Sequence, residues 1–239
     1  MFCQNHEISQ NKGSIMEKQM TFGDIITQIK ETLVQTENMV GFVSPSHFIP
    51  HVKAIINALR NEGLNPTFVY NSNGYDKVES LKSLETYIDV YLPDFKYMEP
   101  DLSLAFSQAR NYPETAGAAI KEMHRQKGSS LRLNDAGLAE SGLIIRHLVL
   151  PNAVENSVKV LQYLAEEISE RLHISLMSQY FPTDKVRHIP QLNRIITSGE
   201  YEQVTNAFHN LGFHRGWLQE PESNEHFRPS FKNDQAFEL

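Results

Sequence analysis

The stretch that decides the fold is Met39-Val40-Gly41-Phe42-Val43, a short apolar run closed by Ser44-Pro45-Ser46. An amphipathic segment follows it, with apolar residues at the spacing of one helix face: Val52, Ile55, Ile56 and Leu59. The same alternation returns along the chain. It predicts further strands at 67–70, 87–92, 142–150, 174–177 and 214–218, and further helices at 78–84, 101–110, 116–126, 157–168 and 201–211. In the helix at 157–168, Ser157 is the expected N-cap. Strands that alternate with helices predict an α/β fold with a parallel sheet and right-handed crossovers.

The size and composition of the chain exclude several classes of protein. Its 239 residues carry 29 acidic and 22 basic side chains, a formal charge of −7, which disfavours a nucleic-acid-binding protein. No apolar run approaches the ~20 residues that cross a membrane, and the first residues do not read as a secretory signal. A single cysteine fits a reducing compartment, so we expect a cytoplasmic protein. One domain over residues 1–220 is expected, with a polar tail at 221–239.

Polar side chains gather where the predicted strands end. Because ligands of parallel α/β sheets bind at the carboxyl ends of the strands, these residues are candidate contacts to a polar small molecule. The set consists of Ser46, His47, Asn71, Asn73, Asp94, Lys96, Arg146 and His147. Simpler alternatives stay open, since strand-end turns are polar in most proteins. Asp94 and Lys96 lie on one face of an extended segment and could form a plain ion pair. Arg146 could pair with a carboxylate, and His147 could be a hydrogen-bonded core residue.

Six segments in order carry a resemblance to a known family: 2–9, 43–48, 70–75, 92–97, 145–151 and 179–182, which read FCQNHEIS, VSPSHF, YNSNGY, LPDFKY, IRHLVLP and QYFP. From the first residues to about Glu220, the chain resembles the radical S-adenosylmethionine (SAM) proteins of the branch related to pyruvate formate-lyase activating enzyme. The resemblance implies a partial (β/α) barrel, a [4Fe–4S] cluster and SAM as cofactors.

The family's cluster motif is CxxxCxΦC, in which Φ is aromatic or apolar, and Phe2-Cys3 matches its last two positions. The resemblance implies that Cys3 is a cluster ligand and that Phe2 borders the adenine of SAM. The other two cysteines and the first strand of the barrel would lie upstream of Met1, which would leave Val40–Val43 as an exposed sheet edge. The family's Gly-Gly-Glu-like turn is replaced here by Ser44-Pro45-Ser46-His47.

The resemblance implies an enzyme that cleaves SAM reductively with an electron from the cluster and then abstracts hydrogen from a substrate. The substrate is unknown. Relatives nearest the namesake act on a partner protein that receives a glycyl radical, and a flavodoxin or ferredoxin would supply the electron. One cysteine cannot hold such a cluster. Either the gene begins upstream and encodes the missing cysteines, or the chain is a pseudoenzyme or a non-catalytic α/β domain that binds a small molecule.

Overall fold

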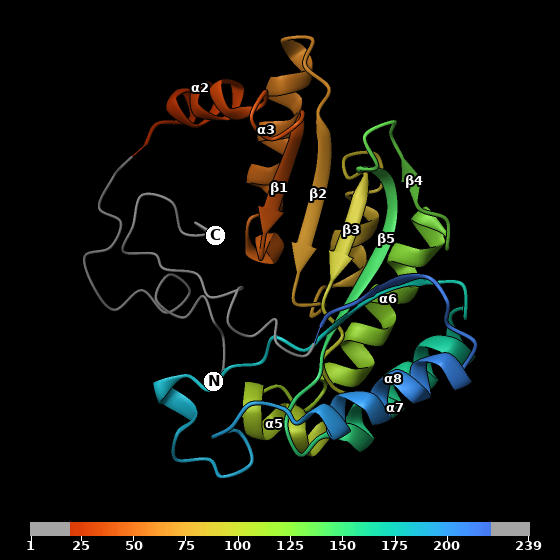
Figure 1. Cartoon of the computed structure of the whole chain (residues 1–239). Coiled ribbons are helices and arrows are strands. Elements are labelled where there is room, and N and C mark those ends of the chain that lie inside the picture. Colours follow the sequence, from red (N-terminus) through yellow and green to blue (C-terminus); the bar gives the residue numbers. More distant parts are fainter. Residues whose placement is uncertain (1–19, 221–239) are drawn as a thin grey trace.

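The structure is a computed structural model that describes residues 20–220 (Figure 1). Its strands are β1 (Met39–Val43), β2 (Thr67–Ser72), β3 (Val90–Pro93), β4 (Arg132–Leu133), β5 (Ala139–Leu148), β6 (His173–Met177) and β7 (Gly216–Leu218). Its α-helices are α2 (Phe22–Thr32), α3 (Ile49–Asn61), α4 (Val78–Lys82), α5 (Pro100–Ser107), α6 (Tyr112–Lys127), α7 (Val154–Glu167) and α8 (Ser198–Asn210). Two 3₁₀ turns are η1 (Pro45–His47) and η2 (Asp184–Val186).

The strands form one sheet in the order β1-β2-β3-β5-β6-β7, and all of these neighbours pair in parallel. The short strand β4 pairs antiparallel with β5 outside this order. The predicted α/β architecture with a parallel sheet is therefore confirmed. The sheet is open within the described residues, with β1 and β7 at its two edges, as a partial barrel requires.

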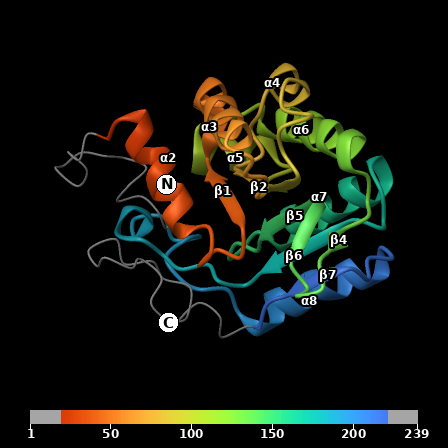
Figure 2. The same cartoon turned by 90° about the horizontal axis from the view of Figure 1, so that it is seen from above.

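Helices cover one face of the sheet. Figure 2 shows α3, α4 and α6 gathered on one side of the first strands, and α8 beside β6 and β7. In β2 the side chains of Phe68 and Tyr70 are buried, and the guanidinium of Arg60 on α3 lies 5.6 Å from the Phe68 ring centroid. Val69 and Asn71, which point to the other face, are only half-buried. The less covered face is the inner face of the partial barrel.

Strand β1 lies at an edge of the described sheet, and its residues Val40 and Phe42 are half-buried. Within residues 20–220 its partner strand is β2, and Val43 at its end is 64% exposed. An open edge of this kind presents unpaired backbone groups to any further strand that reaches it.

No helix in the described range is long and apolar enough to cross a membrane.

Most of the predicted elements are present, with bounds that differ at several ends. The strand expected at 87–92 begins at Val90, because residues 87 and 88 close the turn that follows α4. Helix α7 begins at Val154 with Ala153 as N-cap, so the prediction that Ser157 caps it is wrong. Ser157 is buried, and its hydroxyl contacts a histidine ring instead. Helix α2 and strand β4 were not expected. The polar tail predicted at 221–239 lies outside the described residues.

Candidate functional site

The loops that follow β1, β2 and β3, together with the end of β5, form what we call the rim of the sheet. The turn after β1 starts at Ser44, whose backbone is left-handed (φ 52°, ψ 46°) and donates a hydrogen bond to the Asn71 carbonyl at 2.8 Å. The 3₁₀ turn η1 then presents an exposed His47 and a half-buried Ser46. The first predicted contact segment therefore lies beside the end of β2.

The loop after β2 packs backbone to backbone on the loop after β3. Gly74 has φ +77°, and a Cβ atom there would lie 2.2 Å from the carbonyl oxygen of Asp94. Only glycine permits that approach and that conformation. Asn73 is exposed, and its side-chain oxygen accepts a hydrogen bond from the Tyr75 amide at 3.0 Å. Asn71 is half-buried within β2, next to Val43 and Leu92 in the strand register.

Asp94, Lys96 and Arg146 form a charged cluster at the rim. The Asp94 carboxylate pairs through Oδ1 with Arg146 Nη2 at 2.6 Å and through Oδ2 with Lys96 Nζ at 2.8 Å. The register of the strands brings Asp94 and Arg146 together, because these two residues form a parallel β-bridge. Of the alternatives left open for these residues, the structure shows the ion pair of Asp94 with Lys96 and the carboxylate partner of Arg146.

The charge of this cluster is unbalanced. Burial by itself would raise the pKa of Asp94, but Lys96 and Arg146 outweigh it and hold that pKa below its ordinary value. Two cations therefore face one carboxylate. The side chains of Lys96 and Arg146 keep 23% and 28% of their surface exposed. A cluster with a net positive charge and two partly exposed cations suits an anionic group of a ligand.

His147 lies in the core, behind this cluster. It is fully buried, its Nδ1 is 2.7 Å from the Phe95 carbonyl oxygen, and its Nε2 is 2.9 Å from Ser157 Oγ. Burial lowers its pKa to about 4, so the ring is neutral at physiological pH. Of the two alternatives open for His147, the structure shows the hydrogen-bonded core residue. Both ring nitrogens are occupied, so the residue fixes the strand ends and does not face a ligand.

Three residues that support the rim were not expected from the sequence. Tyr112 places its hydroxyl within 3.1 Å of the Asn73 carbonyl, the Asp94 carbonyl and the Lys96 amide. Asn156 donates from Nδ2 to the Lys96 carbonyl at 2.9 Å. Asp76, which is 3% exposed, accepts hydrogen bonds from three hydroxyl groups. Tyr112 and Asn156 hold the backbone on both sides of Asp94 and Lys96, whereas Asp76 joins the turn after β1 to β2.

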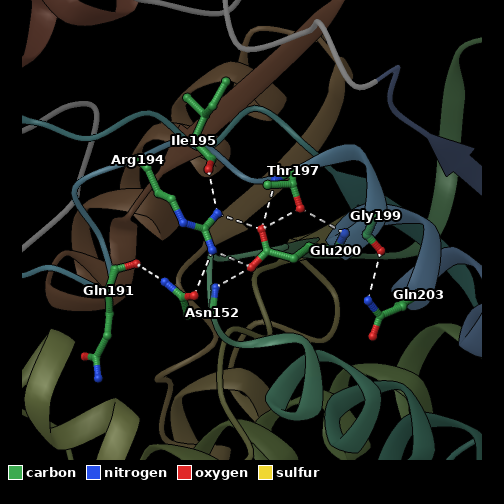
Figure 3. A network of polar contacts seen from close by, with 8 residues as sticks. All are labelled: Asn152, Gln191, Arg194, Ile195, Thr197, Gly199, Glu200 and Gln203. Carbon is green, nitrogen blue, oxygen red and sulfur yellow. Dashed lines mark hydrogen bonds and ion pairs between the residues drawn. The ribbon is translucent and has the colours of Figure 1, made fainter.

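A polar network anchors the loop between β6 and α8, residues 178–197 (Figure 3). The Glu200 carboxylate pairs with Arg194 at 2.7 and 2.8 Å and accepts from the Asn152 amide at 2.7 Å. Asn152, in the turn after β5, also donates to the Gln191 carbonyl. Arg194 lowers the pKa of Glu200 to about 2. The loop is thus attached to the turn at the carboxyl end of β5.

The predicted cluster ligand and the predicted adenine neighbour cannot be placed, because Cys3 and Phe2 lie outside the described residues. Within 20–220, no group of three or more His, Cys, Asp or Glu side chains could hold a metal ion. The rim carries one cationic cluster, exposed amide and imidazole groups, and a buried carboxylate behind the first turn.

Comparison with known proteins supports the fold. No protein-family profile matches the sequence. The chain is 27% identical over 213 residues to an uncharacterized protein, MJ0674, of Methanocaldococcus jannaschii. That alignment covers 87% of this chain and 56% of MJ0674, so the chain spans about half the length of this relative. Among solved structures, the present chain resembles a domain of pyruvate-formate lyase-activating enzyme from Bacteroides vulgatus, with a TM-score of 0.52. The two are 14% identical, and the match covers 76% of this chain and 98% of that domain. Such a likeness establishes a shared fold.

Proposed function

We propose that this chain is the main body of a radical SAM protein of the activating-enzyme-related branch and that it binds SAM along the rim. The observation that carries the proposal is the Asp94–Lys96–Arg146 cluster, which lies at the carboxyl ends of adjacent strands. The fold shared with a domain of an activating enzyme, and the succession of family-like segments that build the rim, support it.

The residues of the rim fit the polar groups of SAM. Lys96 and Arg146 would hold the carboxylate, because their two positive charges face a single protein carboxylate. Asn71, Asn73 and His47 would supply donors and acceptors for the ribose hydroxyls and the adenine edge. His147 would position these contacts without touching SAM, because its hydrogen bond to the Phe95 carbonyl holds the segment between Asp94 and Lys96 in place.

The residues of this chain do not fit a [4Fe–4S] cluster. Such a cluster is held by several cysteine thiolates, and residues 1–239 contain one cysteine, Cys3. We therefore derive no chemical step through a cluster. The proposal assigns the binding and orientation of SAM to residues 1–239, and cluster ligation beyond Cys3 to cysteines that this sequence does not hold.

The single cysteine favours a second candidate, a non-catalytic domain that binds SAM or a similar polar molecule. The two candidates differ in how binding depends on thiolates. In a radical SAM protein, a completed cluster motif adds contacts to SAM. In a binding module, the rim alone accounts for the affinity.

Calorimetric titration of SAM into the full chain tests the proposal. We expect saturable 1:1 binding that Lys96→Ala and Arg146→Ala each weaken at least tenfold, since each removes a charge-assisted contact. Lys121→Ala is the matched control, because Lys121 forms an exposed ion pair with Glu167 on the helices. Failure of the full chain to bind SAM, or equal losses in all three variants, would contradict the proposal.

A second titration separates the candidates. It uses a variant in which a Cys-x-x-x-Cys segment precedes Met1, after anaerobic supply of iron and sulfide. A radical SAM protein should then bind SAM at least tenfold more tightly than residues 1–239 do. Unchanged affinity in a variant that has taken up iron would favour the binding module.

A further inference from the structure

One row of side chains crosses four strands of the sheet, from the charged cluster to the edge strand β7. Asp94 bridges to Arg146, and Arg146 pairs in register with Ser175 in β6. Ser175 pairs in turn with Trp217 in β7. Residues that pair in register point to the same face of a sheet. Trp217 therefore lies on the inner face, the face that carries the proposed SAM contacts.

Trp217 is the one tryptophan of the chain, and 52% of its surface is exposed. By contrast, Ile174 and Leu176 of the adjacent strand β6, which point to the face covered by helices, are fully buried. A single exposed apolar side chain is common on protein surfaces and does not by itself indicate a site. What distinguishes Trp217 is the set of polar and cationic groups around it.

These groups come from β6 and from the residues just before β7. His173 is half-buried and lies two residues before Ser175, so it points to the same face. Arg215 lies two residues before Trp217, and its carbonyl accepts from the Ile174 amide at 3.3 Å. Burial lowers the pKa of His173, and the nearby charge of Arg215 lowers it further. Among residues 20–220, Arg215 has no carboxylate in ion-pair contact, so the surroundings of Trp217 are cationic.

The arrangement fits a ligand that joins a planar aromatic ring to an anionic group. An indole ring stacks on flat π systems such as nucleobases, and a guanidinium pairs with phosphate or carboxylate oxygens. Two residues of a strand span about 6.6 Å, which separates Trp217 from Arg215 by roughly the distance from base to phosphate in a nucleoside 5′-monophosphate. A cationic ligand would be repelled by Arg215.

We infer that the Trp217 end of this row binds a second ligand beside SAM, a nucleotide-like molecule whose ring stacks on Trp217 and whose anionic group pairs with Arg215. The inference rests on the proposed function in one respect. The carboxylate of SAM would occupy Lys96 and Arg146, which leaves the side of the row at β6 and β7 for this ligand. In a SAM-dependent reaction, that is the place of the substrate.

The fluorescence of Trp217 tests the inference directly, because no other tryptophan contributes. The probe is guanosine 5′-monophosphate (GMP), and ribose 5-phosphate is the matched control, since it has the same phosphate and no base. GMP should quench the fluorescence of the full chain saturably, with a dissociation constant of about 1 mM or lower. Ribose 5-phosphate should not quench it. The quenching by GMP should persist in saturating SAM.

Calorimetry of variants assigns the contacts. Trp217→Ala and Arg215→Ala should each weaken GMP about tenfold, because one removes the stacking ring and the other the charged partner. Trp217→Phe keeps an aromatic ring and should retain most of the affinity. Arg132→Ala is the matched control, because Arg132 forms an exposed ion pair with Glu140 in the hairpin of β4 and β5. That variant should bind GMP as the wild-type chain does.

Each outcome bears on one claim. Absence of quenching, or equal quenching by GMP and ribose 5-phosphate, overturns the inference. Loss of the GMP signal on addition of SAM shows that both compete for one site and also overturns it. Either result leaves the proposed function standing, because SAM binding is measured separately. A chain that fails to bind SAM refutes the proposed function, whereas quenching by GMP still decides whether Trp217 forms a site.

Discussion

Lowering the pH should destabilise this protein through His147 well before its carboxylates are protonated. The ring is neutral and fully buried, and burial holds its pKa at about 4, below the ordinary value of 6.5. In the unfolded chain the same ring takes up a proton near pH 6.5. Its contribution to stability is therefore complete above pH 6.5 and is lost as the pH falls through 4.

The size of the effect follows from that difference. One pKa unit corresponds to about 1.4 kcal/mol, so the free energy of unfolding is about 3 kcal/mol lower below pH 4 than above pH 6.5. Between pH 7 and pH 5, proton linkage gives a decrease of about 2 kcal/mol in the free energy of unfolding. Urea unfolding at the two pH values should show it as a fall of about 0.5–1 M in the midpoint.

The matched variant is His147→Gln, which can hydrogen-bond but has no proton to take up. It should be less stable than wild type at pH 7, and the gap should close by about 2 kcal/mol at pH 5. Burial also lowers the pKa values of His124 and His173, and these groups contribute equally to both proteins. If the free energy of unfolding changed equally with pH in wild type and variant, His147 would not be the source of the pH dependence.

Three further outcomes are expected. Gly74→Ala should cost about 2–4 kcal/mol in urea unfolding, because φ is +77° and the new Cβ would meet the Asp94 carbonyl; a loss under 1 kcal/mol would contradict that packing. Glu200→Gln should cost about 1–2 kcal/mol and speed proteolysis within residues 178–197, since Arg194 loses its charged partner; unchanged cleavage would show that the network does not anchor the loop. Residues 1–239 should stay colourless after anaerobic supply of iron and sulfide, because Cys3 is the lone cysteine, and a brown protein with roughly four irons per chain would refute this.

Apolar runs in the sequence sufficed to predict the sheet, because β1, β2, β5 and β6 each contain a short apolar run. Helix α2 was overlooked although its start carries a signal. Thr21 and Asp24 form a capping box, with both reciprocal bonds present. The spacing of Asp94 and Lys96 was likewise enough to indicate an ion pair as one of two alternatives.

The remaining features depend on contacts between distant segments. Arg146 reaches Asp94 because β3 and β5 pair in one register, which the sequence does not specify. Ser157 looks like a helix cap, but its hydroxyl is taken by His147, a partner ten residues away in another element. Asp76 looks like an ordinary turn residue. Its importance follows from burial and from hydroxyls on the turn after β1 and on β2, which only the fold brings together.

Amide hydrogen exchange of the full chain, with and without saturating SAM, tests the central claim most directly because it locates the ligand. Bound SAM should slow exchange at residues 44–48, 71–75, 94–97 and 146–148 and leave it unchanged in the hairpin of β4 and the start of β5. Slower exchange confined to the hairpin or to α2, or no change anywhere, would contradict the claim that the rim binds SAM.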